Sequence, residues 1–228
     1  MQKLTIFIIG LIFVSCSQVL IKQEKTSNSD SLSEAKVVTK TKAQQTLDST
    51  YRLLDIATAK DTLGFKNSEP FLFFKSGYIL SSTEKNAIII VCPTDTTYSV
   101  KLYSIRSKKW ELTDSIGELD AFPSQFELTF DDYNFDKQTD IYIQVSASQG
   151  WSLSRGHLFT IDPVTKKLTR HKEARDLANM RPDPKTKTVV SELWKGYNDK
   201  NQDQLTIFTN KWMNGKLKTI KKKNITLK

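Results

Sequence analysis

The residues best suited to chemistry lie in the stretch 131–145, an acidic turn followed by an alternating strand. Oxygen-bearing side chains occupy relative positions one, three, five and nine of this turn: Asp132, Asn134, Asp136 and Asp140. Ca²⁺ takes six to eight oxygen ligands, and alternate residues of a tight loop can direct their oxygens toward one ion. With the backbone carbonyl of Gln138 as a further ligand, this spacing predicts one calcium site.

Two positions argue against a calcium loop of the EF-hand type. Lys137 stands where such loops have glycine, and Ile143 stands where they have a bidentate glutamate. A non-glycine residue in a left-handed conformation costs roughly 1–2 kcal/mol. The alternative is a metal-free turn in which Asp132 and Asn134 accept hydrogen bonds from backbone amides. Both interpretations carry equal weight.

Two groups of aromatic residues follow expected strands. The loop Ser146–Gly156 carries Trp151 and Arg155, and Trp194 and Tyr197 follow a later strand. Exposed Trp, Tyr and Arg side chains often anchor interfaces, and Trp can stack on sugars. We predict that these four residues contact a protein or glycan partner. The alternative is that both tryptophans close the ends of the core.

The sequence contains none of the motifs HExxH, GxSxG, GxGxxG or the P-loop. We therefore expect no enzymatic activity and no catalytic residue. The alternative is a hydrolase that uses an acidic pair such as Glu118 and Asp120. Such an enzyme needs two carboxyl groups roughly 5–10 Å apart in a pocket.

The first residues have the pattern of an export signal. Lys3 precedes the apolar run Leu4–Val14, which is too short to span a bilayer comfortably. The run ends in Phe-Val-Ser-Cys at 13–16, which resembles the lipobox of bacterial lipoproteins, although that motif usually begins with Leu. The resemblance implies removal of 1–15 and a diacylglycerol thioether on Cys16, with acyl chains such as palmitate. An ordinary secretory signal is the alternative.

Residues 16–46 are rich in Ser, Thr, Lys and Gln and contain no aromatic residue, which is typical of a flexible tether. We expect a protein of the bacterial cell envelope, held on a membrane through Cys16 at the outer membrane or facing the periplasm. Cys92 is then the one remaining thiol. Because it follows the apolar run 88–91, we expect a buried strand residue without a function of its own.

The net charge of +9 is unevenly distributed. Residues 47–215 hold 22 basic and 22 acidic residues, whereas 216–228 hold six lysines and no acid. A nucleic-acid-binding protein carries its basic residues on a folded face. We therefore predict no nucleic-acid partner and a basic tail at 221–228, outside the fold. A purely structural lipoprotein, whose tail touches anionic lipid or polymer, is a further alternative.

The elements that position these residues begin with a segment, 47–60, that fits a helix better than a strand. Its predicted apolar face holds Leu47, Tyr51, Leu54 and Thr58. The apolar runs Phe71–Phe74 and Tyr78–Leu80 flank Gly77 and predict a hairpin.

Three similar units follow, each with a strand, a loop and a hairpin whose first strand ends in an apolar–aromatic–hydroxyl triplet. The strands are expected at 87–91, 140–145 and 188–191, and the triplets lie at 102–104, 158–160 and 207–209. The triplet aromatics Tyr103, Phe159 and Phe208 are 56 and 49 residues apart. A period near 50 residues is typical of propeller blades, each an antiparallel sheet of about four strands.

We therefore predict an all-β domain over 47–220, built from antiparallel hairpin repeats in a partial or small β-propeller-like arrangement, with a short N-terminal helix. An open sandwich is the alternative.

The acidic stretch also resembles a known kind of loop. FG-GAP and VCBS-type propeller proteins have Asp-x-Asn-x-Asp-Gly-x-x-Asp-Leu/Ile before a strand, and here Asn134-Phe135-Asp136 leads to Asp140-Ile141. Over about residues 85–220 the chain is similar to small exported bacterial proteins with one NFDG-type loop on a propeller-like β-fold. These include periplasmic lysozyme inhibitors. The resemblance implies a monomeric inhibitor that inserts a loop, here Ser146–Gly156, into the enzyme's cleft.

Overall fold

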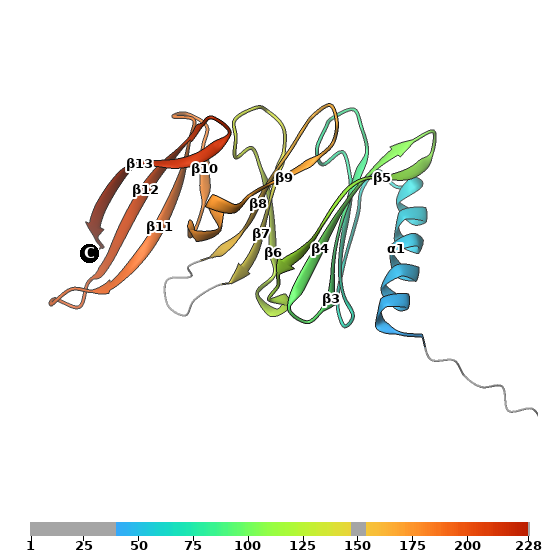
Figure 1. Cartoon of the computed structure of the whole chain (residues 1–228), viewed down its shortest axis with the longest axis horizontal. Coiled ribbons are helices and arrows are strands. Elements are labelled where there is room, and N and C mark those ends of the chain that lie inside the picture. Colours follow the sequence, from blue (N-terminus) through green and yellow to red (C-terminus); the bar gives the residue numbers. More distant parts are fainter. Residues whose placement is uncertain (1–39, 147–153, 228) are drawn as a thin grey trace, which may run out of the picture. The chain divides into compact units, whose positions relative to one another are not determined.

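The computed structural model describes residues 40–146 and 154–227. Cys16, most of the predicted tether and Trp151 lie outside these ranges. Within them, one α-helix is followed by three antiparallel sheets in chain order (Figure 1). No helix of the described ranges is long and apolar enough to cross a membrane. The predicted all-β class with one N-terminal helix is confirmed.

The helix is α1 (Lys42–Thr58). Sheet A consists of β1 (Leu63–Ser68), β2 (Phe71–Gly77), β3 (Asn86–Thr94), β4 (Thr97–Arg106) and β5 (Lys109–Asp120). Sheet B consists of β6 (Glu127–Asp131), β7 (Asp140–Ser146), β8 (Arg155–Ile161) and β9 (Leu168–His171). Sheet C consists of β10 (Arg181–Asp183), β11 (Thr188–Tyr197), β12 (Asp203–Met213) and β13 (Lys216–Thr226). Short 3-10 helices are η1 (Pro123–Gln125) and η2 (Lys172–Asp176).

Helix α1 begins earlier than predicted, because Thr41 caps it by accepting a hydrogen bond from the amide of Gln44 (3.2 Å). The domain therefore starts before residue 47, inside the predicted tether. The buried face also differs from the prediction, since it consists of Thr50, Leu53, Leu54 and Ala57. Tyr51 is 61% exposed, and the small Ala57 side chain lies fully buried against the sheet instead.

Strand β3 is covered on both faces, which explains its continuous apolar run. Ala87, Ile89 and Val91 pack with Leu53 and Leu54 of α1 in one cluster. The alternate residues belong to the main core, where the inner faces of sheets A and B meet. That core includes Ile88, Ile90, Leu102, Ile141, Ile143 and Phe159. Sheet A is therefore a layer between the helix and sheet B.

Sheet B packs against sheet C through its other face. The shared cluster includes Tyr133, Tyr142, Leu158, Val189 and Leu217. Two polar contacts close this interface: the indole Nε1 of Trp212 donates to the carbonyl of Tyr133 (2.6 Å), and the amide of Leu217 donates to Glu173 (3.1 Å). Each sheet therefore covers an apolar face that its neighbour cannot bury alone.

The three predicted units are confirmed as consecutive antiparallel strands. The expected strands lie in β3, β7 and β11, and the expected triplets lie in β4, β8 and β12. In each sheet the triplet strand pairs with the strand before it and the strand after it. The units were recognisable because the same local pattern builds the same three-strand meander each time.

Two predicted elements were wrong. The hairpin around Gly77 does not form: Phe71–Gly77 is one strand, β2, which pairs with the preceding β1 and with the following β3. The second error concerns the predicted tail, because Lys221–Thr226 belongs to β13 and pairs with β12 along its length. Lysine is common on edge strands, where its charge hinders unwanted pairing with other chains. The basic run is therefore part of the fold.

Candidate binding face on the C-terminal sheet

The acidic turn between β6 and β7 is held by its own backbone amides. Asp132 accepts hydrogen bonds from the amides of Asp136 (3.2 Å) and Lys137 (2.9 Å). Asn134 also accepts from the amide of Asp136, and Asp136 accepts from that of Gln138. Lys137 has a φ of 72°, the left-handed conformation that favours glycine. These contacts correspond to the metal-free turn.

Asp140 is the exception in this turn. It is fully buried, and its Oδ2 accepts from the amides of Tyr133 (2.9 Å) and Asn134 (3.2 Å), whereas its Oδ1 has no partner among the described residues. Burial, reinforced by the charges of Asp136 and Asp132, raises the pKa of Asp140 to about 7. An unpartnered buried carboxylate oxygen is compatible with a cation ligand.

The other oxygens of the turn are less suited to a metal, since they already accept backbone hydrogen bonds. Across 40–146 and 154–227, no group of three or more His, Cys, Asp or Glu side chains is arranged to hold a metal ion. The calcium site stays a prediction. Asp132, Asn134, Asp136, Asp140 and the Gln138 carbonyl would be its ligands.

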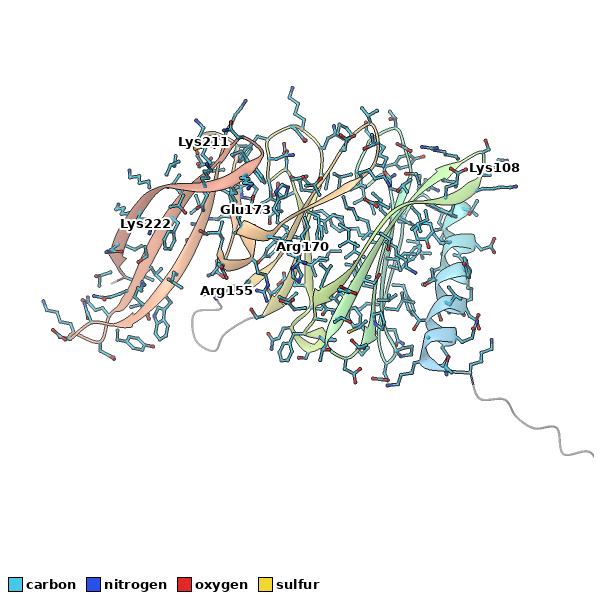
Figure 2. All side chains as sticks on the ribbon, in the orientation of Figure 1. Lys108, Arg155, Arg170, Glu173, Lys211 and Lys222 are labelled. Atoms are coloured by element: carbon cyan, nitrogen blue, oxygen red, sulfur yellow. The ribbon has the colours of Figure 1, made fainter. Side chains whose placement is uncertain are left out.

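Of the two acidic residues considered for hydrolysis, Asp120 forms an ion pair with a neighbouring arginine. The Asp120 carboxylate pairs with Arg175 (2.9 Å), which lowers the pKa of Asp120. The backbone carbonyl of Asp120 lies 3.1 Å from Nε2 of the buried His157. Arg170, labelled in Figure 2, lies 3.2 Å from the other ring nitrogen of His157. Since Arg can only donate, His157 donates through Nε2 to Asp120 and is neutral.

The predicted partner-binding residues are only partly brought together. Trp194 and Tyr197 pack edge to face at the end of β11, with ring centroids 5.5 Å apart. The indole of Trp194 donates to Asp203 (2.8 Å), which fixes its plane, and Tyr197 is 60% exposed. Arg155 begins β8 in sheet B, opposite Ser146. Nothing described links Arg155 to the aromatic pair, and Trp151 is not described.

Sheet C carries a basic surface that we call the lysine face. Side chains alternate between the two sides of a strand, and Val189, Asn210 and Leu217 lie on the side toward sheet B. The register places five exposed lysines on the opposite side: Lys211, Lys216, Lys218, Lys221 and Lys223. Within the described chain, none of these five makes an ion pair with an acidic side chain.

The arrangement of charge on the lysine face is unfavourable for stability alone. Lys211 and Lys218 lie directly opposite each other on β12 and β13, a position in which like charges destabilise a sheet. The acidic Glu192 on the same side is already paired with Arg181. None of the five lysines therefore has an ion-pair partner among the described residues, and all five lie on a folded sheet.

The lysine face also carries apolar and aromatic groups. In the strand register, Trp194 is opposite Leu205, which in turn is opposite Ile225, so these three residues lie on the same side as the lysines. Trp194 was predicted from the sequence as a contact residue, whereas the lysine face was not, because the basic run from residue 221 onward has the composition of a tail. Residues 216–220 lay inside the predicted domain, but the assignment of 221–228 to a tail separated Lys221 and Lys223 from Lys216 and Lys218 on the same strand.

The opposite side of sheet C has a groove of about 480 Å³ next to the residues that follow η2. Phe208, Ser191 and Lys222 contribute to its wall, and the Lys222 ammonium lies 5.5 Å from the centre of the Phe208 ring. Figure 2 shows Lys211 and Lys222 as labelled side chains of sheet C.

Comparison with known proteins found no family model that matches this chain and no match among curated proteins. The resemblance to FG-GAP loops and lysozyme inhibitors therefore has no support from relatives, and it stays a prediction.

Proposed function

We propose that this chain is a membrane-anchored binding protein of the bacterial cell envelope, and that the lysine face recognises an anionic glycan. The observation that carries the proposal is the set of five exposed lysines without ion pairs on one side of sheet C. A ligand of opposite charge would compensate this repulsion. Each lysine close to an anionic surface contributes roughly 1 kcal/mol.

The aromatic pair at the end of the lysine face favours a glycan over other polyanions. The rings of Trp194 and Tyr197 are held at 84° to each other, and Tyr197 is largely exposed. A fixed, exposed aromatic ring offers an apolar surface to the faces of sugar rings. The lysines would bind the acidic groups of the ligand, and the aromatic pair would stack on its sugar rings. Together these two features favour an acidic polysaccharide.

Two further parts of the proposal concern anchoring and architecture. Cys16 is proposed as the lipid attachment site, which would hold the domain on the envelope membrane. We further propose that the protein is a monomer and that it has no enzymatic activity. Sheets B and C each have four antiparallel strands, as propeller blades do, and sheet A has five. We infer that the three described sheets correspond to blades of a partial or small propeller-like arrangement.

A binding comparison with matched polymers tests the proposed ligand. Full-length protein is titrated with dextran, dextran sulfate and duplex DNA at constant ionic strength. We expect binding to dextran sulfate, weaker binding to DNA and none to neutral dextran. Equal binding to DNA and dextran sulfate would show that only charge is recognised, and no binding to either would remove the lysine face as a site.

The replacement Tyr197→Ala separates sugar recognition from charge. We expect it to weaken binding of dextran sulfate and to leave binding of DNA unchanged. An equal loss for both polymers would contradict the role proposed for the aromatic pair. A protein partner is tested separately with a panel of lysozymes, in which inhibition of any member would favour the protein-ligand alternative.

A further inference from the structure

A cavity of about 450 Å³ lies between α1 and the end of sheet A, on the part of the domain that the proposed function does not use. Helix α1, the β1–β2 turn, the end of β3 and η1 with the residue before it all contribute to its wall. Cavities of about 300–1,000 Å³ with mostly apolar walls are typical of sites for small ligands.

The apolar part of the wall continues to the protein surface. Phe71 and Val91 form its buried part, at 5% and 9% exposure. Leu47 and Phe122 are also wall residues, yet they are 39% and 51% exposed. Large apolar side chains that remain exposed beside a cavity often mark a place where a ligand covers them. An apolar chain lying across Leu47 and Phe122 would remove both from water.

The charged residues of the wall differ in how well they are compensated. Lys42 and Glu69 form an ion pair with each other. Asp95 is exposed and therefore solvated by water. Lys101 is partly buried, and it makes no ion pair or side-chain hydrogen bond with any described residue. Its strand neighbours Val100 and Leu102 point into the core between sheets A and B, so Lys101 lies on the side of sheet A that faces α1.

We propose that this cavity binds a fatty acid, with the alkyl chain against the apolar wall and the carboxylate at the ammonium of Lys101. A single alkyl chain would cover the apolar wall, and a carboxylate would supply the partner that Lys101 lacks. The anionic head group is preferred over a cationic one because the partly buried Lys101 gains more from a charge partner than the solvated Asp95 loses by repulsion.

Cys92 provides a direct reporter, because it is another wall residue and is only partly buried. Its thiol donates to the carbonyl of Thr94 (2.7 Å), and burial raises the pKa of the thiol. The chain contains only two cysteines, so the full-length Cys16→Ser variant has Cys92 as its single thiol. A ligand in the cavity should shield this thiol from a small alkylating reagent.

The test measures the rate at which N-ethylmaleimide modifies Cys92 in the full-length Cys16→Ser variant. Dodecanoate, dodecanol and dodecyltrimethylammonium are compared at concentrations below the micelle concentrations of the two ions and below the solubility limit of the alcohol. We expect dodecanoate to protect the thiol with an affinity at least about tenfold higher than the other two, the effect of one contact worth about 1.4 kcal/mol. N-acetylcysteine in the same mixtures reports any loss of reagent to the amphiphile. Equal protection by all three would contradict the role of Lys101, and no protection by any would contradict the site.

Two variants keep the test independent of folding defects. Lys101→Gln should lower the affinity for dodecanoate to that of dodecanol and leave dodecanol unchanged. Ala43→Trp places a bulky ring at an exposed wall position of α1 and should abolish protection, whereas Gln44→Trp, on the same helix turn but outside the wall, should retain it. Protection that survives Ala43→Trp would overturn the proposal.

Discussion

Lys211 and Lys218 are paired directly across β12 and β13, with no acidic side chain bridging them. Their mutual repulsion should be measurable. We expect Lys218→Glu to stabilise the protein by about 0.2–1 kcal/mol, the range for cross-strand pairs, and to weaken binding of dextran sulfate. Urea denaturation at low ionic strength measures the first effect, and the polymer titration measures the second.

The control for this prediction is Lys200→Glu, which makes the same charge change in the β11–β12 turn. It should leave both quantities nearly unchanged. Stabilisation that persists unaltered in 1 M salt would show that charge repulsion is not its cause, since salt screens exposed charges.

His157 should make the domain less stable in acid. Burial, reinforced by Arg170, lowers the pKa of His157 in the folded state. Below its ordinary pKa of about 6.5 the unfolded chain binds the proton more readily, so the free energy of unfolding falls as the pH decreases. Asp140 acts in the opposite direction, because its raised pKa favours the folded state in acid. The pH dependence of the wild-type free energy of unfolding therefore combines both effects, and the contribution of His157 is obtained by comparison with a His157 variant.

We expect the loss of stability between pH 7.5 and pH 5.5 to be smaller in His157→Gln, which retains a donor for the Asp120 carbonyl. Chemical denaturation at several pH values measures this difference. An identical pH dependence in the two proteins would mean that His157 does not titrate differently on folding.

Ca²⁺ should act through Asp140 if the predicted metal site forms. The unpartnered Oδ1 of Asp140 would bind the metal ion, so 2 mM Ca²⁺ should raise the Tm of the wild-type protein relative to its Tm in the presence of a chelator. Asp140→Asn, which keeps an acceptor for the amides of Tyr133 and Asn134, should show no such increase. Mg²⁺ at the same concentration serves as the control. An unchanged wild-type Tm would leave the loop as a metal-free turn.

Gly156 allows β8 to approach β7 closely. A Cβ atom at this position would lie 2.1 Å from the carbonyl oxygen of Ile143. Because this oxygen belongs to the backbone, it cannot move aside as the end of a flexible side chain could. We expect Gly156→Ala to destabilise the protein by about 1–3 kcal/mol or more. Gly117→Ala is the matched control, because its Cβ would meet no atom within 4 Å. Thermal denaturation of both variants tests the register of sheet B, and equal Tm values would contradict it.

Short sequence patterns predicted the strands that have a buried apolar run and the strands that carry the repeated triplet. The run Ile88–Val91 and the triplets ending in Ser104, Thr160 and Thr209 all lie in strands. Strand β1 was missed because Leu63–Ser68 has almost no buried residue and hence no apolar alternation. The face of α1 was shifted because the small Ala57, and not Tyr51, lies against sheet A, which depends on how closely the helix approaches.

The proposed binding residues could be predicted from the sequence only where the residue type alone suggests an interface, as it does for exposed aromatic residues. Trp194 and Tyr197 were identified, and they do form a pair. The lysine face was not identified, because it depends on the pairing of β12 with β13, which converts a run of basic residues into a patterned surface. The premise that the basic charge lies outside the fold was therefore wrong, although the prediction of no nucleic-acid partner awaits the DNA titration.

The affinity of the full-length protein for dextran sulfate, measured at two salt concentrations, tests the central claim most directly. The variant Lys221→Gln with Lys223→Gln removes two charges from the lysine face, and Lys108→Gln with Lys109→Gln removes two from the tip of the β4–β5 hairpin in sheet A. We predict a loss of roughly 10- to 50-fold for the first pair, since each lysine contributes about 1 kcal/mol, together with a weaker salt dependence. The second pair should retain wild-type affinity. Equal losses for both pairs, or none for Lys221 and Lys223, would contradict the lysine face as the binding site.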